Sequence, residues 1–410
     1  MRLLVVGTGG RAYREYLLAS IGARYEVHLL LGAEPTWERE HVAGWTVLDL
    51  TDTLGAEPMI AAARALDPPP DGVLSWDEAR VLQVAKIAAA LGLPGGDPEA
   101  VLRCRDKQRT RAALDPAGVP QPRWAAARTP DEALAAADRI GYPVVLKPRA
   151  MAASLGVVRV DGPAELVARF GFARDTTVPG AWRYDEVLVE EFLTGPEISV
   201  DCAVHHGRVY PLCVARKEVG YPPYFEEVGH VVDAADPLLS DPELLAVVQD
   251  AHTALGYADG ITHTELKLTP AGPKLVEVNA RLGGDLIPYL GLRATGVDPG
   301  LAAAAVACGR PPVLAPDRKL VGAVRFFYVE ADDTTIGSVR FGPLPSTVDQ
   351  AVPLVEPGDV VSPPPAGTLF GRVAFATAVA ASAAECAAAL ADAAAALEIR
   401  AVPPARGEEA

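Results

Sequence analysis

Residues 261–289, ITHTELKLTPAGPKLVEVNARLGGDLIPY, decide how this chain folds. Polar and apolar side chains alternate on both sides of a PAGP segment, and strict alternation is typical of a half-buried β-strand. Proline and glycine favour a turn at 270–273. The stretch therefore predicts a β-hairpin, followed by a glycine loop at Gly283 and Gly284 and a helix that begins near Leu286. The apolar face of the hairpin is predicted to hold Thr264, Leu266, Leu268, Val276, Val278 and Ala280.

The opposite face of this hairpin carries its charged side chains. With Ala271 at the centre of the turn, Glu265 lies opposite Glu277, and His263 lies opposite Asn279. Directly opposed carboxylates weaken a sheet. The register therefore predicts that a cation offsets them.

The expected cation is a divalent metal ion. Glu265, Glu277 and Asn279 supply hard oxygen ligands, which suit Mg²⁺ and also Mn²⁺. Arg281 lies two residues beyond Asn279 and adds a fixed positive charge to the same face. The alternative is an exposed edge hairpin with ordinary surface charge. Three oxygen ligands and an arginine on one face favour a functional site.

Size and composition narrow the class of protein. The chain has 410 residues, enough for two or three domains, and half of them are hydrophobic. Its net charge of −16 argues against a nucleic-acid partner, which needs a basic face. The five cysteines form no CxxC pair, so neither a zinc site nor a disulfide framework is indicated. The first apolar run is too short for a signal peptide, and no stretch is long enough to span a membrane. We expect a cytoplasmic protein.

The first 97 residues predict a small α/β domain. Apolar runs at 3–6, 27–31, 45–49 and 72–75 predict strands, with helices between them. Gly7, Gly9 and Ala12 match a dinucleotide-binding fingerprint, and Glu34 lies where a ribose-binding acid would fall. Any tight crossover from strand to helix favours glycines, so this match is a weak signal. A nicotinamide-dependent dehydrogenase stays open as an alternative.

The middle of the chain places cations next to strands and helix starts. Asp97 and Asp106 are predicted helix caps, and Lys107 and Arg111 share one face of the second helix. An exposed basic surface is the simplest explanation of that pair. Lys147 ends a buried strand, which is unusual for an unpaired lysine. The loop of small residues at 150–156 follows it, and its N–H groups can cradle phosphate oxygens.

Two further strands, a loop and a C-terminal region follow the lysine strand. Strands are predicted at 187–193 and 197–204, the second with Ile198, Val200, Cys202 and Val204 in the core. Residues 220–229 predict an aromatic, proline-rich covering loop that His230 closes. A histidine in that place is more often structural than catalytic. Residues from 311 onward predict strands at 320–329 and 371–379 and a helix at 382–397, without a catalytic constellation.

Four of these segments, in this order, resemble the ATP-grasp enzymes over about the first 310 residues. They are DKQRTR at 106–111, YPVVLKP at 142–148, VEEFLTGPEISVD at 189–201 and TELKLTPAGPKLVEVNARLGGD at 264–285. Within that family the chain is most similar to the L-amino-acid ligases of the bacilysin-synthetase type. That likeness depends on NARLGGD, on His263-Thr264-Glu265 and on the aromatic loop that ends in His230.

The resemblance implies roles for individual residues. Lys107, Lys147 and the loop residue Ser154 would contact ATP phosphates, and Glu197 would bind the ribose. The adenine would lie against the linker Glu190, Glu191, Phe192 and Leu193. The metal ligands would be Glu265, Glu277 and Asn279. Arg281 and Gly284 would meet the acyl carboxylate, with His230 near the amine. The loop MAASLG has alanines where the family usually has glycines, which puts its phosphate contacts in doubt.

The resemblance also implies an architecture and a reaction. We expect an ATP-grasp fold of mixed α/β and α+β class: a Rossmann-like domain at 1–97, an ATP-grasp domain at 98–310 with a small lid at about 120–190, and an α+β domain at 311–410. The expected activity joins a small carboxylic acid to an amine through an acyl phosphate, with ATP and Mg²⁺. The partners would be small molecules, with a homodimer as an open question. Other acceptors, such as a carrier-protein thiol or a purine-pathway amine, stay open, as does an ATP-binding module without activity.

Overall fold

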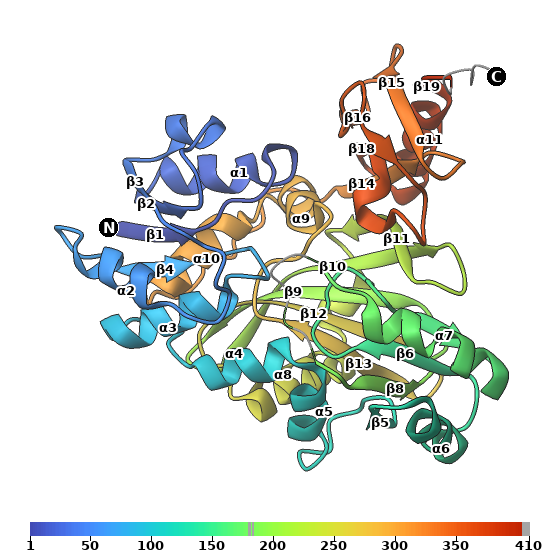
Figure 1. Ribbon diagram of the computed structural model, residues 1–410. Coiled ribbons are helices and arrows are strands. Elements are labelled where there is room, and N and C mark those ends of the chain that lie inside the picture. The colour runs from blue at the N-terminus through green and yellow to red at the C-terminus, as the bar shows by residue number, and fades with distance from the viewer. Residues whose placement is uncertain (179–181, 183, 404–410) are drawn as a thin grey trace, which may run out of the picture.

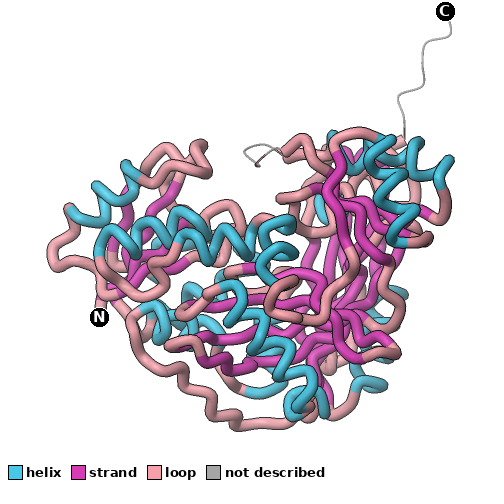
Figure 2. The backbone as a smooth tube through the Cα atoms, turned by 90° about the horizontal axis from the view of Figure 1, so that it is seen from below, coloured by secondary structure: helices cyan, strands magenta, loops and turns pink. Residues whose placement is uncertain are grey.

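The computed structural model describes residues 1–178, 182 and 184–403. The N-terminal part and the C-terminal part stand apart above a central body that contains most of the strands (Figure 1). In the view from below, the strands run through this body (Figure 2). This arrangement agrees with the predicted three-part organisation, whose boundaries stay predictions.

The N-terminal part contains a parallel four-stranded sheet. Its order is β3 (Gly44–Val47), β2 (Glu26–Leu31), β1 (Arg2–Val6) and β4 (Gly72–Leu74), so all four predicted strands are confirmed. After Arg2, the first strand is apolar because both faces of a parallel sheet are covered. The helices around it are α1 (Arg11–Gly22), α2 (Glu57–Arg64) and α3 (Val81–Leu91), with a 3-10 turn η1 (Trp37–His41).

Helix α3 begins at Val81, after a turn, and ends at Gly92, which adopts the left-handed conformation. Glu78 therefore lies in the turn before the helix, from which its carboxylate contacts Arg105 and Arg281.

The predicted helix caps after the N-terminal part are confirmed. The Asp97 carboxylate accepts hydrogen bonds at the start of α4 (Pro98–Arg105), and the Asp106 carboxylate does so at the start of α5 (Lys107–Leu114). Both basic residues of α5 that share a face, Lys107 and Arg111, are buried, so the exposed basic surface considered for them is wrong.

A small lid follows these helices. Its four-stranded antiparallel sheet has the order β5 (Trp124–Ala127), β8 (Val187–Glu191), β6 (Val144–Pro148) and β7 (Val158–Val160). Helices α6 (Pro130–Ile140) and α7 (Pro163–Asp175) pack on this sheet. The sheet occupies the range predicted for the lid.

The central body is an eight-stranded antiparallel sheet that extends into the C-terminal part. Its order is β13 (Gly272–Asn279), β12 (Gly260–Thr269), β9 (Glu197–His205), β10 (Arg208–Gly220), β11 (Glu226–Asp233), β14 (Val321–Tyr328), β18 (Arg372–Ala380) and β16 (Val348–Pro353). Helix α8 (Pro242–Leu255) packs with α4 on one face, over the predicted core residues of β9. The pairing of β11 with β14 makes the sheet continuous across the proposed 310/311 boundary.

At the site, the residues of the β12–β13 hairpin pair as predicted. The turn and the bulge that produce this pairing differ from what we assumed. His263 pairs with Asn279 and Glu265 with Glu277, as predicted. Nearer the turn, Leu266 pairs with Leu275, so the register shifts by one residue and Val276 is left out of the ladder. The turn is therefore tighter than we assumed, and a β-bulge restores the expected pairing.

The bulge changes which face Val276 occupies. We expected Val276 in the core, but Leu275 takes that place, fully buried, while Val276 lines the nucleotide-sized pocket described below. The Val276 carbonyl, which the ladder does not use, accepts a hydrogen bond of 2.7 Å from Arg111 Nη2. A buried arginine on α5 thus stabilises the irregular backbone beside the site.

The covering loop predicted at 220–229 is shorter in the structure than we expected. Strand β10 continues to Gly220 and β11 begins at Glu226, so the connection is short. His230 lies in the middle of β11, where it pairs with Val324 of β14, and does not close a loop.

The C-terminal part contains more strands than the sequence indicated. The predicted strands β14 and β18 and the helix α11 (Ala383–Ala396), capped by Ser382, are confirmed. The proline-rich middle holds β15 (Thr334–Phe341), β16 and β17 (Val360–Val361), and β19 (Leu397–Ala401) pairs with β15. The remaining elements are α9 (Ile287–Thr295), α10 (Pro299–Ala307), η2 (Pro237–Ser240) and η3 (Thr368–Gly371). Among the described residues, no helix is long and apolar enough to cross a membrane.

Candidate active site

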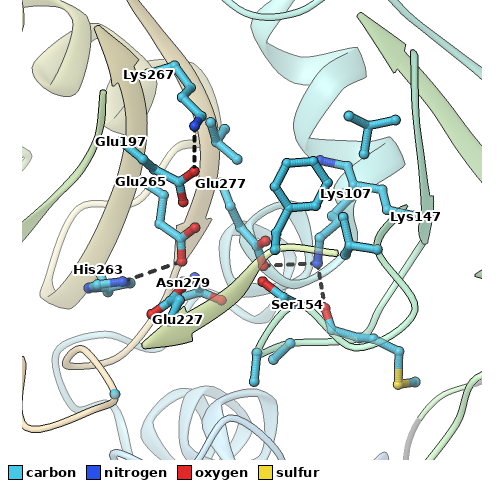
Figure 3. Close-up of a pocket in the computed structure, with 18 of the residues that line it drawn as sticks. Lys107, Lys147, Ser154, Glu197, Glu227, His263, Glu265, Lys267, Glu277 and Asn279 are labelled. Carbon is cyan, nitrogen blue, oxygen red and sulfur yellow. Dashed lines mark hydrogen bonds and ion pairs between the residues drawn. The ribbon is translucent and has the colours of Figure 1, made fainter. Parts of the chain in front are cut away.

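A pocket lies between the lid sheet and the β12–β13 hairpin. All predicted site residues except His230 line it. In Figure 3, Glu265, Glu277 and Asn279 project from the hairpin side, and Lys107, Lys147 and Ser154 approach from the other side. Residues from segments more than 100 positions apart in the sequence thus meet at one place.

The hairpin wall supplies the oxygen atoms expected for a metal site. Glu265 and Glu277 are direct cross-strand partners, and Asn279 lies two residue pairs further along, on the same face. One Glu277 oxygen lies 3.0 Å from Lys107 Nζ. Glu265 lies 3.4 Å from His263 Nε2. Two carboxylates and an amide oxygen on one wall match the donor chemistry of Mg²⁺.

A buried lysine holds three carboxylates of this wall together. Lys217 Nζ lies 2.7 Å from Glu227, 3.0 Å from Glu265 and 3.3 Å from Glu197, and the lysine side chain has no exposed surface. Burial alone would lower the pKa of Lys217, but the three carboxylates raise it well above its ordinary value. The ammonium therefore stays charged and fixes the orientation of Glu265 and Glu197.

A second buried cation supports Glu265 from the side. His263 Nδ1 lies 2.6 Å from Asp201, and this carboxylate also accepts a hydrogen bond from the Gly283 N–H. Although burial opposes the charge, Asp201 and Glu265 raise the pKa of His263 to about 9. A charged His263 thus links the hairpin to the glycine loop that follows it.

The opposite wall carries the two lysines predicted to contact phosphates. Lys107 Nζ donates to the Met151 carbonyl at 2.5 Å, which ties the helix start to the small-residue loop. Lys147 Nζ lies 2.6 Å from Glu190. Burial lowers the pKa of Lys147 to about 8, although Glu190 opposes that shift. Both lysines are nearly inaccessible yet face the pocket.

Glu190 is a structural anion at the base of this wall. It receives two hydrogen bonds from Arg111, at 2.8 and 3.1 Å, in addition to the contact with Lys147. Burial would raise the pKa of Glu190, but these two cations hold it at about 2. Its carboxylate is therefore already paired with Arg111 and Lys147.

The rest of the linker provides a mostly apolar rim. Phe192 and Leu193 line the pocket with Val276 and Val145, and the Arg159 guanidinium lies 4.4 Å from the centre of the Phe192 ring. Glu191 is tied to Lys274 and Arg123 at the edge. A flat heteroaromatic ring fits between such side chains.

The small-residue loop adopts the backbone of a glycine loop without the glycines. Ala153 and Ser154 both have φ of 55°, in the left-handed region that favours glycine. Two such residues in succession cost conformational energy, of order 1–3 kcal/mol each. Ala153 and Ser154 are thus held in a conformation that glycines would adopt readily.

Arg281 and Gly284 lie where the pocket opens into a second cavity. Arg281 Nε donates to Glu78 at 2.5 Å, and Nη1 donates to the Leu282 carbonyl. Glu78 in turn pairs with Arg105 at 3.2 Å. The Glu78 carboxylate therefore orients Arg281 from the N-terminal part.

His230 does not line the pocket. It is completely buried behind the wall, with Nε2 lying 3.2 Å from Glu227 and 3.4 Å from Asp285. Burial opposes its charge, but the hydrogen bonds that His230 makes to the Asp285 and Glu227 carboxylates raise its pKa. In this structure His230 can influence a bound molecule only through those two carboxylates.

Sequence reasoning missed two residues that line the pocket, Asp285 and Arg372, and also Lys217, which is buried behind the carboxylates of the wall. Arg372 begins β18 in the C-terminal part and makes a bidentate pair with Asp285, at 2.6 and 2.8 Å. It lines the pocket, so the C-terminal part does contribute to the site. Lys147 drew attention because it is a basic residue at the end of a mostly apolar strand. Arg372 has the same position at the start of β18, so the same pattern could have identified it.

The comparisons with known proteins agree with this geometry. Residues 140–288 match the family model of the ATP-grasp domain. Over 354 residues the chain is 30% identical to carnosine synthase 1 of Gallus gallus, covering 78% of this chain and 37% of that protein. Over 241 residues it is 27% identical to alanine–anticapsin ligase of Bacillus subtilis (strain 168), covering 54% of this chain and 50% of that protein.

A solved structure shares the whole fold. The crystal structure of an L-amino acid ligase from Bacillus licheniformis matches with a TM-score of 0.79 and 23% identity, over 97% of this chain and 98% of that one. Residues 140–288 are an ATP-grasp domain, and the predicted likeness of the chain to L-amino-acid ligases is confirmed. It spans half or less of the length of the two curated relatives named above.

The low pKa of Lys147 gives a testable pH dependence. Lys147 loses its proton as the pH rises through about 8, so its attraction for phosphate is present below that pH and lost above it. We expect the affinity for Mg·ADP to fall by up to about tenfold per pH unit between pH 8 and 9.5. Lys147→Arg stays charged and should remove this slope. Calorimetric titration of both proteins across that range checks it, and equal slopes would show that another group is responsible.

Proposed function

We propose that this protein is an ATP-dependent ligase that activates a carboxylate as an acyl phosphate and joins it to an amine. The observation that carries the proposal is the meeting of two lysines, three oxygen donors and Arg281 in one pocket. Lysines contact phosphate, oxygen donors bind Mg²⁺, and a guanidinium holds a carboxylate. Relatives named as a synthase and a ligase support the same reaction class.

Each residue of the pocket has its own role in binding the substrates. Lys107 and Lys147 hold the phosphates, Glu197 takes the ribose and the 190–193 linker takes the adenine. Glu265, Glu277 and Asn279 would hold Mg²⁺. When bound, the metal ion neutralises charge on the phosphate oxygens. The carboxylate substrate lies against Arg281 and Gly284, in line with the terminal phosphate.

The reaction then needs little covalent help from the protein. A carboxylate oxygen attacks the terminal phosphorus, the bond to ADP breaks, and an acyl phosphate forms. The amine attacks the acyl carbon, phosphate leaves with the former carboxylate oxygen, and the amine nitrogen loses a proton. Positioning and charge neutralisation carry both steps, which explains the absence of a Ser-His-Asp constellation among the residues lining the pocket.

The same chemistry bears on the compartment and the partners of the protein. All five cysteines are free, and the reaction consumes ATP, which together favour the cytoplasm. The substrates are small molecules in this proposal, and a homodimer stays a prediction. The nicotinamide alternative loses support, because Glu34 pairs with Arg39 and Trp45 at the surface.

The reaction class is tested by product analysis. With Mg²⁺, ATP and a matched acid and amine, we expect ADP and phosphate in equal amounts with an amide. A screen of all amino acids, singly and in pairs, with chromatography of nucleotides and mass detection of products, makes the measurement. Release of AMP and pyrophosphate would mean that the carboxylate is adenylated and the acyl-phosphate mechanism is wrong.

The role of Arg281 is tested by one conservative change. Arg281→Lys keeps the charge but cannot bind Glu78 and grip a planar carboxylate together. We expect kcat to fall about 10²-fold, while the KM for ATP stays within about threefold. Arg105→Lys is the matched control, since Arg105 also pairs with Glu78. If Arg281→Lys is as mild as the control, with an unchanged melting curve, Arg281 has only a structural role.

A further inference from the structure

A second, larger cavity adjoins the nucleotide-sized pocket. It has a volume of about 1330 Å³ and lies between the N-terminal part and the C-terminal part, which stand apart in Figure 1. Arg281, Gly284 and Arg372 line both spaces. A molecule that reacts beside Arg281 can therefore extend into this cavity.

Five arginines line the described surface of this cavity, and four of them have a carboxylate partner. Arg80 lies 3.8 Å from Asp77, Arg105 and Arg281 share Glu78, and Arg372 pairs with Asp285. The fifth, Arg14, forms no ion pair with any described residue. Among the described arginines that line the cavity, Arg14 is therefore the one without a carboxylate partner.

Arg14 is held in place by the backbone of the site. Its Nη1 donates to the Gly283 carbonyl at 3.1 Å, next to Gly284. Gly9 packs against it, since a Cβ there would lie 3.4 Å from Arg14 Cγ. The glycine-rich turn before α1, which suggested a dinucleotide site, thus brings an arginine to the reaction loop.

The surroundings of Arg14 favour an anion. Burial lowers the pKa of its guanidinium, and neighbouring Arg281 lowers it further. One carbonyl uses one of the five N–H donors and supplies no negative charge. Asp201 and Asp285 are near enough to favour the charge but do not pair with it. A partly buried cation beside a second cation is costly until an anion joins them.

We propose that Arg14 binds a second anionic group of a substrate, distinct from the carboxylate that Arg281 holds. This inference rests on the proposed ligase function. The group is a carboxylate or phosphate carried by the amine, as in an α-amino acid, or by the acid, as in a dicarboxylic acid. The cavity thereby selects substrates with an anion at a fixed distance from the reacting atoms.

The two sources are separated by substrates that differ only in that anion. In one arm the amine is varied, and alanine and the other amino acids are each compared with the corresponding amino-acid amide. The other arm compares succinate with butyrate as the acid. ADP formation is measured with wild type and with Arg14→Gln. We expect Arg14→Gln to raise KM about 10- to 100-fold for the substrate that carries the anion, and to leave its neutral analogue unchanged.

Two controls make the result specific. Arg80→Gln removes another arginine from the same cavity, one already paired with Asp77 and hydrogen-bonded to Gln83, so it should change KM less than threefold. Affinity for Mg·ADP, measured by calorimetry, should be the same in both variants, because neither residue lines the nucleotide-sized pocket.

The outcomes distinguish this inference from the function on which it rests. Equal use of charged and neutral substrates by wild type, or equal KM changes in Arg14→Gln and Arg80→Gln, would overturn the anion site and leave the ligase intact. No ADP with any acid and amine would remove both. A KM change confined to the amine arm identifies an amino-acid acceptor, and one confined to the acid arm identifies a dicarboxylate.

Discussion

The contact of one buried ammonium, that of Lys217, with three carboxylates is the interaction on which the rest of the site depends. Glu197, Glu227 and Glu265 come from three strands, and without a cation they would repel one another in the interior. Removing one partner of a buried ion pair typically costs about 3–5 kcal/mol. The lysine also takes the place at which these three carboxylates could bind a metal ion, and in the proposed ligase this leaves the Glu277 side for Mg²⁺.

Other buried charges extend this arrangement into each part of the molecule. Arg111 and Glu190 fix the bulge and the linker, Glu78 orients Arg281 from the N-terminal part, and Arg372 reaches Asp285 from the C-terminal part. A ligase must bring nucleotide, acid and amine together before the chemistry begins. The paired charges hold the walls of the site in place for that purpose.

The sequence predicted the strands of the N-terminal sheet, the helix caps and the cross-strand pairing of Glu265 with Glu277, because these depend on local periodicity and turn residues. It did not predict the bulge at Val276, whose effect cancels an error of one residue in the turn. Nor could it find Lys217, because the partners of a buried charge are distant in sequence. His230 was placed at a loop end because aromatic and proline residues suggested a loop where β11 begins.

The account is tested most directly by the affinity of the ADP-bound protein for Mn²⁺, measured by electron paramagnetic resonance in wild type, Lys217→Met and Lys217→Arg. If Lys217 orients Glu265 as a metal ligand, Lys217→Met should bind Mn²⁺ about 10- to 100-fold more weakly, and Lys217→Arg, which keeps the charge, should lose less. A Lys217→Met protein that melts cooperatively and binds Mn²⁺ as tightly as wild type would contradict the account.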